Sequence, residues 1–530
     1  MSTAASATVA AAEPQPLPAF RAIPDLVADQ AKLRGLARAL VAEGKTVSWV
    51  EFDRRVNRVA NALMGLGLGR GDKVAILAPP SIEYVEAFVG ALRMGACVVP
   101  LSTMASTDAL EMMVRDSDSR VLMLGEAMRN LVAPFLDRLP GLVPGGRIAF
   151  DFASPGWSDF AGWVAAASDA APRIELGPDD QFNIIYSSGT TGVPKGILHS
   201  HLMRFGHVER GEFLGYGHEA ITLLSTPLYS NTTLVALFPT LAHGGTTILM
   251  RRFDAAGYLE IAERERVTHT MLVPVQYQRL LAHPDFDKYD LGSFRMKLST
   301  SAPLRAGVKR AILDRWPGQL VEFYGLTEGG GGCMLNASLY PNKLHTVGQP
   351  GLGADVRIID EAGNELPQGE TGEIVGRSTN MMTGYYKQPG KTGEIHWRDK
   401  AGELFFRTGD MGRFDEDGFL ILLDRKKDMI ISGGFNVYAA DIEAILSKHP
   451  DVSDVAVIGV PSEQWGETPL ALVVRRGGSA VEAEVLRAWA NEQLGKTQRI
   501  SAVEFRDSLP RSSIGKILKR ELREPYWRNT

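Results

Sequence analysis

The stretch Tyr186-Ser-Ser-Gly-Thr-Thr-Gly-Val-Pro-Lys-Gly196 follows the apolar run Gln181-Phe-Asn-Ile-Ile185. Its glycines leave backbone N–H groups open to close approach by an anion, and its hydroxyl side chains can donate further hydrogen bonds. The residues that we expect to hold a polyphosphate are Ser187, Ser188, Gly189, Thr190, Thr191 and Lys195. Pro194 stands where a P-loop needs the glycine before its lysine, so this is a different kind of phosphate loop.

Helix and strand patterns alternate on both sides of this loop. Helical periodicity is found in 49–72 and 81–96, and each of these segments is followed by a short apolar strand pattern. The same alternation returns in 232–250 and 255–275. Alternating strands and helices predict a mainly parallel sheet with helices on its faces. We therefore expect a large α/β domain.

The pattern changes after Gly353. Short strand patterns at 355–360, 372–377 and 418–424 are separated by turn residues, which indicates a β-rich subdomain. A compact mixed segment of about one hundred residues follows, the size of a separate small domain. The predicted fold is α/β, with a tail at 1–20, a large N-terminal domain at 21–425 and a small α+β domain at 426–530.

Composition excludes several classes of protein. The 530 residues contain 57 Lys+Arg and 62 Asp+Glu, with no basic block for nucleic acid. No apolar run reaches the roughly 18 residues of a transmembrane segment. The Ala- and Pro-rich start has no Lys or Arg before Arg21, so a disordered tail on a cytoplasmic protein is expected. Cys97 and Cys333 match no metal-ligand spacing, which argues against a zinc site or a disulfide framework.

The phosphate loop resembles the signature of the adenylate-forming superfamily, which includes acyl-CoA synthetases, peptide-synthetase adenylation domains and beetle luciferases. Alone it could be an ordinary Ser/Gly loop, but other motifs follow in the family's order. Glu322-Phe-Tyr-Gly-Leu-Thr-Glu328 resembles the YGxTE motif. The resemblance implies that Tyr324 stacks on adenine, Thr327 contacts phosphate and Glu328 helps to hold Mg²⁺. A carboxylate beside a triphosphate suits a hard cation.

Two shorter motifs extend the implied nucleotide site. Thr408-Gly-Asp410 resembles the TGD motif, whose aspartate binds the ribose hydroxyls. Ser299-Thr-Ser-Ala-Pro-Leu304 resembles a small-residue segment that lines the adenine and acyl sites, although Thr300 and Ser301 stand where glycine or alanine is frequent. The residues given to nucleotide binding on this basis are Ser301, Ala302, Pro303, Glu322, Phe323, Tyr324 and Asp410.

The stretch Asp424-Arg-Lys-Lys-Asp-Met-Ile-Ile-Ser-Gly-Gly-Phe-Asn-Val-Tyr438 resembles the family's interdomain hinge and the loop after it. The resemblance makes Arg425 a ribose ligand and Lys427 the pivot. It also places Gly433 and Gly434 in a loop that lines a pantetheine tunnel once the C-terminal domain rotates. A solvated charge cluster is the alternative interpretation of the five polar residues.

The C-terminal stretch Pro510-Arg-Ser-Ser-Ile-Gly-Lys-Ile-Leu-Lys-Arg-Glu-Leu522 resembles the family's last motif. Its lysine after glycine bridges the substrate carboxylate and the α-phosphate, which makes Lys516 the candidate catalytic residue with Glu328 and Thr327. Lys519 and Arg520 are expected to form a solvated helix face.

The resemblance implies ATP, Mg²⁺ and coenzyme A as cofactors and a small carboxylic acid as substrate. Coenzyme A is favoured because Ser432-Gly-Gly-Phe-Asn-Val-Tyr438 resembles CoA ligases more than peptide-synthetase domains, and because the chain ends soon after Lys516. The alternative is a stand-alone adenylation protein that transfers the acyl group to a phosphopantetheinyl carrier instead of to coenzyme A. A nucleotide sensor without catalysis is the alternative from another class, and a homodimer is left open.

The segment Thr226-Pro-Leu-Tyr-Ser-Asn-Thr-Thr-Leu234 resembles the part of the family that contributes to the acid pocket. Many relatives carry an aromatic residue followed by histidine there, whereas this chain has Tyr229 followed by Ser230. The candidate pocket residues are Tyr229, Ser230, Leu234, Gly325, Gly330 and Gly331. Glycines at the pocket floor would leave volume for a bulky or extended hydrophobic monocarboxylate, with acetate and amino acids as poor substrates. The alternative is that the glycines satisfy turn geometry alone.

Overall fold

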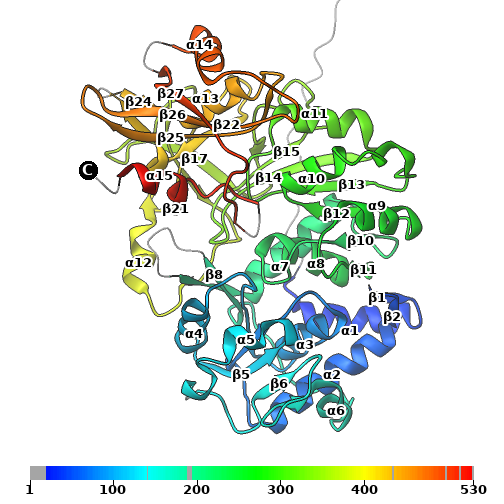
Figure 1. Cartoon of the computed structure of the whole chain (residues 1–530). Helices are drawn as coiled ribbons and strands as arrows, with labels where there is room; N and C mark the ends of the chain where they lie inside the picture. Colours follow the sequence, from blue (N-terminus) through cyan, green and yellow to red (C-terminus); the bar gives the residue numbers. More distant parts are fainter. Residues whose placement is uncertain are drawn as a thin grey trace, which may run out of the picture.

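The computed structural model describes residues 19–139, 141–187, 194–432, 435–495, 498–512 and 515–527. The N-terminal half forms one end of the molecule, and the C-terminal residues, orange to red, lie at the other (Figure 1). Almost all of the expected tail at 1–20 lies outside the described residues. Phe20 does not belong to a tail, because its ring packs edge-on against Phe205 at 5.6 Å.

The first two predicted helices are present, and each begins at a serine N-cap. Helix α2 (Trp49–Gly65) begins at Ser48, whose hydroxyl accepts a hydrogen bond from the Glu51 N–H. Helix α3 (Ile82–Arg93) begins in the same way at Ser81. The two helices pack closely at Gly90, where a Cβ would lie 2.5 Å from the Val59 side chain. Glycine at this position therefore allows the helices to touch.

The sheet that carries the phosphate loop contains the first expected strands. Its order is β19 (Gly384–Tyr385), β9 (Lys195–Ser200), β8 (Gln181–Ser187), β4 (Cys97–Pro100), β3 (Lys73–Leu77), β5 (Ser119–Leu124), β6 (Arg147–Ala149) and β7 (Ser158–Asp159). Strands β3, β4, β5, β6 and β8 pair in parallel, and β9 returns antiparallel to β8. The phosphate loop thus connects two neighbouring strands.

A second large sheet is also mainly parallel. Its order is β16 (Gln349–Pro350), β15 (Cys333–Asn336), β14 (Gln319–Tyr324), β13 (Met296–Ser299), β12 (His269–Leu272), β10 (Ile221–Leu224), β11 (Thr246–Leu249), β1 (Arg38–Ala42) and β2 (Lys45–Ser48). Strands β10 to β14 are parallel, so the segments after β13 and β14 emerge side by side at one edge of the sheet. These segments are the small-residue motif and Tyr324-Gly-Leu-Thr-Glu328.

Two smaller sheets complete the fold. One contains β17 (Asp355–Ile359), β18 (Gly372–Arg377), β21 (Leu404–Phe414), β20 (His396–Arg398) and β22 (Leu420–Arg425). The other contains β24 (Phe435–Val437), β23 (Ile430–Ser432), β26 (Gly466–Arg475), β25 (Val452–Ser462) and β27 (Ala502–Phe505). The chain changes sheet between Arg425 and Ile430, beside the boundary that the sequence predicts. The boundary itself remains a prediction.

Helices cover the sheets, and the largest core lies where helices α2, α3 and α8 pack between the two large sheets. The remaining α-helices are α1 (Ile23–Arg34), α4 (Thr107–Asp116), α5 (Arg129–Val132), α6 (Phe160–Ala165), α7 (His201–Phe213), α8 (Asn231–Ala242), α9 (Ala255–Arg264), α10 (Pro274–Leu281), α11 (Ala306–Arg315), α12 (Pro389–Glu394), α13 (Ala439–Leu446), α14 (Ala483–Gln493) and α15 (Lys519–Trp527). A search of the described residues finds no helix with the length and apolar character needed to span a membrane. Cys97 and Cys333 are buried free thiols.

Candidate active site

The phosphate loop is anchored by its two strands. Ser187 ends β8 and lies opposite Lys195, which begins β9. The Lys195 ammonium lies 4.9 Å from the centre of the Tyr385 ring. Of the predicted phosphate ligands, Ser188, Gly189, Thr190 and Thr191 lie outside the described residues, so their roles remain predictions.

Three predicted nucleotide ligands meet at one end of the YGLTE segment. The Tyr324 hydroxyl donates to Asp410 Oδ2 at 2.9 Å, and Asp410 Oδ1 lies 3.3 Å from Arg425 Nε. Tyr324 ends β14, whereas Asp410 and Arg425 come from the neighbouring strands β21 and β22, about 80 to 100 residues later in the sequence. Burial and the nearby Asp410 raise the pKa of the Tyr324 phenol well above its usual range. Tyr324 therefore remains a donor, and the carboxylate of Asp410 is fixed between a phenol and a guanidinium.

The other end of the segment carries Thr327 and Glu328. The Tyr385 hydroxyl donates to Glu328 Oε1 at 2.9 Å, and the Glu328 carbonyl accepts from the Met382 N–H at 2.8 Å. The ring of the same Tyr385 contacts the Lys195 ammonium. The structure thus brings the phosphate-loop lysine and the predicted metal-binding glutamate to one side chain. The sequence around Gly384-Tyr-Tyr-Lys387 does not predict that Tyr385 contacts both Lys195 and Glu328.

A single carboxylate fits magnesium in a nucleotide site. In the described part of the chain, no cluster of three or more His, Cys, Asp or Glu side chains could hold a metal alone. Mg²⁺ usually takes one or two protein carboxylates and completes its shell with waters and substrate phosphates. Glu328, next to the phosphate-loop strand, can supply such a hard oxygen ligand.

Sequence reasoning also missed a buried polar network behind Thr327. Arg204 donates to His199 Nδ1 at 2.8 Å and to Asn183 and Asn231. A guanidinium cannot accept, so Nδ1 is the acceptor and Nε2 carries the proton. Nε2 therefore donates to the Thr327 carbonyl at 2.8 Å. Burial, reinforced by the Arg204 charge, lowers the His199 pKa and keeps the ring neutral.

The small-residue segment after β13 packs beside the YGLTE segment. Ser301 has φ +80°, and its hydroxyl is hydrogen bonded to Thr232 at the start of α8. The Thr300 hydroxyl donates to the Phe323 carbonyl at 3.0 Å. Ala302 is half-buried and Pro303 is exposed. The segment therefore ties the predicted nucleotide site to the helix of the predicted acid pocket.

Glu322 has a visible packing role. Its carboxylate pairs with the Lys309 ammonium and accepts from the Leu304 N–H, and both charged side chains are 2% exposed. Burial raises the pKa of Glu322, while Lys309 opposes this shift. These contacts account for the Glu322 side chain without a ligand, and its part in nucleotide binding remains a prediction.

The predicted acid-pocket residues differ in their surroundings. Tyr229 is 8% exposed, and its hydroxyl has no hydrogen-bond partner in the described part of the protein. Ser230 is buried at the N-cap of α8. Leu234 is 0% exposed and belongs to the main core, which explains it by packing alone. A Cβ on Gly325 would meet Gly332 Cα at 4.0 Å, an ordinary van der Waals contact, so no clash forces glycine at this position.

Packing also explains the glycine run. Gly330 has φ +91°, and a Cβ there would lie 3.0 Å from the Gly376 carbonyl oxygen. A Cβ on Gly331 would lie 2.7 Å from Gly376 Cα. The backbone of Gly376 thus fills the space that the sequence interpretation left for substrate. This geometry supports the turn-and-packing alternative for Gly330 and Gly331.

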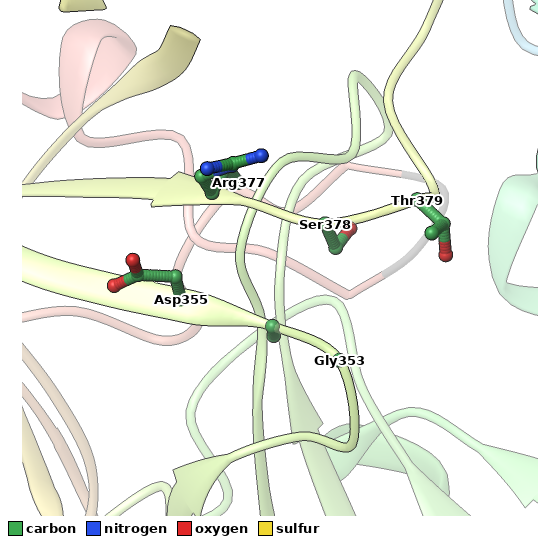
Figure 2. Close-up of a pocket in the computed structure, with 6 residues that line it drawn as sticks. Gly353, Asp355, Arg377, Ser378 and Thr379 are labelled. Atoms are coloured by element: carbon green, nitrogen blue, oxygen red, sulfur yellow. The ribbon is translucent and has the colours of Figure 1, made fainter. Parts of the chain in front are cut away.

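A cavity of about 370 Å³ lies behind this run, at the start of β17 and the end of β18. Figure 2 shows Asp355, Arg377, Ser378 and Thr379 around it. Its lining contains none of the predicted catalytic residues, but the Ser378 hydroxyl donates to the Gly330 carbonyl. The cavity therefore adjoins the glycine run that follows the YGLTE segment.

The lysine motif touches the large domain. Gly515 lies against the first turn of α10, because a Cβ there would be 2.6 Å from Val275 Cγ1. Arg305 Nη2 donates to the Val455 carbonyl at 3.0 Å across the same interface. Lys516, half-buried, follows Gly515. This contact brings the candidate lysine to the side of the large domain that carries the small-residue segment.

The predicted hinge segment is held by a largely buried ion cluster. Lys519 lies 3.3 Å from Asp424 Oδ2 and 3.0 Å from Glu443 Oε1, and its side chain is 15% exposed. The expectation of a solvated helix face was wrong for Lys519, because α15 turns it inward onto two carboxylates, whereas Arg520 is exposed as expected. Lys427 lies in a short 3₁₀ turn, but its side chain and Gly433 and Gly434 lie outside what the structure describes.

Comparison with known proteins identifies the family. Residues 27–386 match the model of the AMP-binding enzyme family, and 441–516 match that of the AMP-binding enzyme C-terminal domain. The chain is 35% identical to feruloyl-CoA synthase of Amycolatopsis sp, covering 94% of this chain and 97% of the relative. It is 32% identical to the long-chain-fatty-acid–CoA ligase FadD13 of Mycobacterium tuberculosis, with 91% and 93% covered.

A solved structure agrees with the sequence comparisons. ATP-bound MatB from Rhodopseudomonas palustris superposes with a TM-score of 0.85 at 31% identity, over 96% of this chain and 99% of that one. The chain therefore belongs to the AMP-binding enzyme family. Within that family it is an AMP-forming acid–thiol ligase of the acyl-CoA synthetase type.

Proposed function

We propose that this chain is an ATP-dependent acid–CoA ligase. It joins a carboxylate to ATP to give acyl-AMP and pyrophosphate, and then transfers the acyl group to the thiol of coenzyme A. The observation that carries the proposal is the arrangement of the Tyr324–Glu328 segment. Asp410 and Arg425 meet Tyr324 at one end of it, and Tyr385 and Lys195 meet Glu328 at the other.

The two ends suit the two parts of ATP. Tyr324 offers a ring for adenine, while Asp410 and Arg425 offer an acceptor and a donor for the ribose. Lys195 would face the triphosphate, and Glu328 would hold magnesium there. Magnesium, when bound, neutralises charge on the phosphate oxygens as pyrophosphate leaves.

The adenylation step needs no nucleophilic side chain. A substrate carboxylate oxygen attacks the α-phosphorus, the bond to the bridging oxygen breaks, and pyrophosphate carries away the electron pair. Lys516 would sit between the carboxylate and the α-phosphate and stabilise the negative charge that builds there. Placement of the Gly515 turn against α10 supports this role.

In the second step the CoA sulfur attacks the acyl carbonyl, the bond to AMP breaks, and the thiol proton is released. Lys516 must then withdraw, and we propose that the C-terminal domain rotates about Lys427 and presents the 432–438 loop to the pantetheine arm. The change of sheet between Arg425 and Ile430 supports a hinge in this position.

For the acid we propose a hydrophobic monocarboxylate, either aryl-alkyl or medium- to long-chain aliphatic. The similarity to a feruloyl-CoA synthase and to a long-chain-fatty-acid–CoA ligase supports this class. The buried Tyr229 also supports it. Each buried methylene contributes about 0.8 kcal/mol, so kcat/KM should rise severalfold per carbon until the pocket is full.

Pyrophosphate exchange with a panel of acids tests the proposal. The panel should include acetate, hexanoate, octanoate, cinnamate, a hydroxycinnamate and an amino acid. Exchange should be strong with the longer or aryl acids, and added CoA should yield the thioester. Product with a phosphopantetheinyl carrier but none with CoA would favour the carrier-loading alternative. Absence of exchange with every acid, despite ATP binding, would favour a nucleotide sensor.

A further inference from the structure

The segment 380–386 lies between the two halves of the predicted phosphate site. On one side, the Met382 N–H donates to the Glu328 carbonyl, and Gly330 N–H donates to the Asn380 carbonyl. On the other side, Thr383 and Tyr386 N–H groups donate to carbonyls of β9, at 2.9 and 2.7 Å. This strap therefore ties the strand after the phosphate loop to the segment that carries Glu328.

Tyr385 extends the same connection to the side chains. It is 8% exposed, its hydroxyl donates to Glu328 Oε1 at 2.9 Å, and its ring lies under the Lys195 ammonium at 4.9 Å. Its backbone is fixed by pairing with Ile197 and by a hydrogen bond to Thr392. Few rotamers can satisfy all of these contacts together, so the phenol has a defined position.

We propose that Tyr385 is a positioning residue that orients the Glu328 carboxylate toward the metal and holds Lys195 beside it. This inference rests on the proposed function, since it assumes that Glu328 binds the metal of the metal–nucleotide complex. Outer hydrogen-bond partners commonly orient a metal-binding carboxylate and tune its affinity. A ring face attracts an ammonium group without neutralising it.

The alternative arrangement shows why an intervening ring matters. Lys195 and Glu328 carry opposite charges in neighbouring segments, and a direct ion pair would occupy both groups. No ion pair between them is found in the part of the chain that the structure describes, and each group instead contacts Tyr385. With Tyr385 between them, Oε1 is bound by a neutral donor and the ammonium faces a ring. Both charges thus stay available to a metal triphosphate.

The test compares Tyr385→Phe with Tyr386→Phe. Tyr386 is a matched control because it follows directly, and its hydroxyl donates to Asp118. The probe is Mn²⁺, whose binding in the presence of a non-hydrolysable ATP analogue is followed by electron paramagnetic resonance. Affinity for the analogue without metal is measured by calorimetry.

Tyr385→Phe should weaken Mn²⁺ binding about tenfold and leave metal-free nucleotide affinity unchanged, because the lost contact is to the metal ligand. Tyr386→Phe should change neither.

A second substitution separates the two contacts. Tyr385→Leu removes the ring as well, so metal-free nucleotide affinity should now fall, because Lys195 loses its support beside the phosphates. Wild-type metal affinity in a folded Tyr385→Phe protein would overturn the proposal and leave Tyr385 as a packing residue. If the wild-type protein itself binds no Mn²⁺ with the analogue, the role of Glu328 in the proposed function fails, which is a different result.

Discussion

Lys516 lies in a turn that is fixed on both sides. Arg511 donates to the Gly515 carbonyl at 2.7 Å, and the Ser512 hydroxyl accepts from the Lys516 N–H at 3.1 Å. Gly515 itself packs on Val275 of the large domain. These contacts involve the backbone of Gly515 and Lys516 and not the lysine side chain, so a truncated side chain should retain them.

We expect Lys516→Ala to lose adenylate formation while it retains thioester formation from supplied acyl-AMP. The lysine stabilises charge in one half-reaction only, and removal of a central electrostatic group costs about 3 kcal/mol, or roughly a hundredfold in rate. Single-turnover assays of the two half-reactions check this. Equal losses in both would contradict the assignment.

At the scale of single residues, motifs predicted the groups to which we assign chemical roles, but not the contacts that hold these groups in place. Tyr324, Asp410 and Arg425 carry a recognisable pattern, and the structure brings them together. Tyr385 and His199 do not, because their roles arise from contacts between segments that no local spacing encodes. Lys519 was misread for the same reason: its sequence neighbours are polar, but its partners come from β22 and α13.

At the scale of elements, the Asp424–Lys519–Glu443 cluster joins α15 to the proposed hinge segment. Lys519→Ala would leave two largely buried carboxylates without their cation, so unfolding should become easier by about 3 kcal/mol. Chemical denaturation followed by circular dichroism measures this. Arg520→Ala, on the exposed side of the same helix, is the control and should change stability by less than about 0.5 kcal/mol. Indistinguishable midpoints for the two variants would refute a stabilising cluster.

A substitution at the proposed hinge should have the opposite kinetic effect to Lys516→Ala, because it should slow thioester formation and spare adenylate formation. Lys427→Pro fixes φ at the pivot, which should obstruct domain rotation but leave the adenylating arrangement accessible. Acyl-AMP should form at close to the wild-type rate and accumulate, while CoA transfer slows strongly. Rapid-quench measurement of both steps checks this, and unchanged transfer would show that the pivot lies elsewhere.

The elements themselves were largely predictable. Apolar periodicity predicted helices α2 and α3 and the strands that follow them, β3 and β4. The sheet order was not predictable, because it depends on pairing between distant segments. The Gly384–Tyr385 strand shows this: it lies between β18 and β20 in sequence, yet it joins β9 in another sheet. Because this strand pairs with β9, Tyr385 lies within hydrogen-bond distance of Glu328.

At the scale of the whole molecule, buried histidines should make stability depend on pH. His201 and His269 are at most 1% exposed, and burial lowers the pKa of each to about 4. In the unfolded chain the usual pKa is about 6.5. The unfolded state therefore gains protons that the folded state cannot accept as pH falls from about 6.5 toward 4, and stability is lost over this window.

Each of these histidines should cost about 2 kcal/mol of stability at about pH 5 relative to neutral pH. Thermal unfolding should show Tm falling steadily on acidification over this range. His269→Gln should flatten part of the slope, while substitution of the exposed His345 should leave it as in the wild type. A Tm that is constant from neutral pH to about pH 5 would contradict the neutral, buried state of these rings.

The central claim is that the acid is activated as an acyl adenylate. An acid labelled with heavy oxygen in its carboxyl group tests this directly, because attack of the carboxylate on the α-phosphorus leaves one acid oxygen in AMP when the thioester forms. Mass spectrometry of the nucleotide product after turnover with CoA should find the label in AMP. Label in inorganic phosphate with ADP as the nucleotide product, or unlabelled AMP beside labelled thioester, would contradict the account.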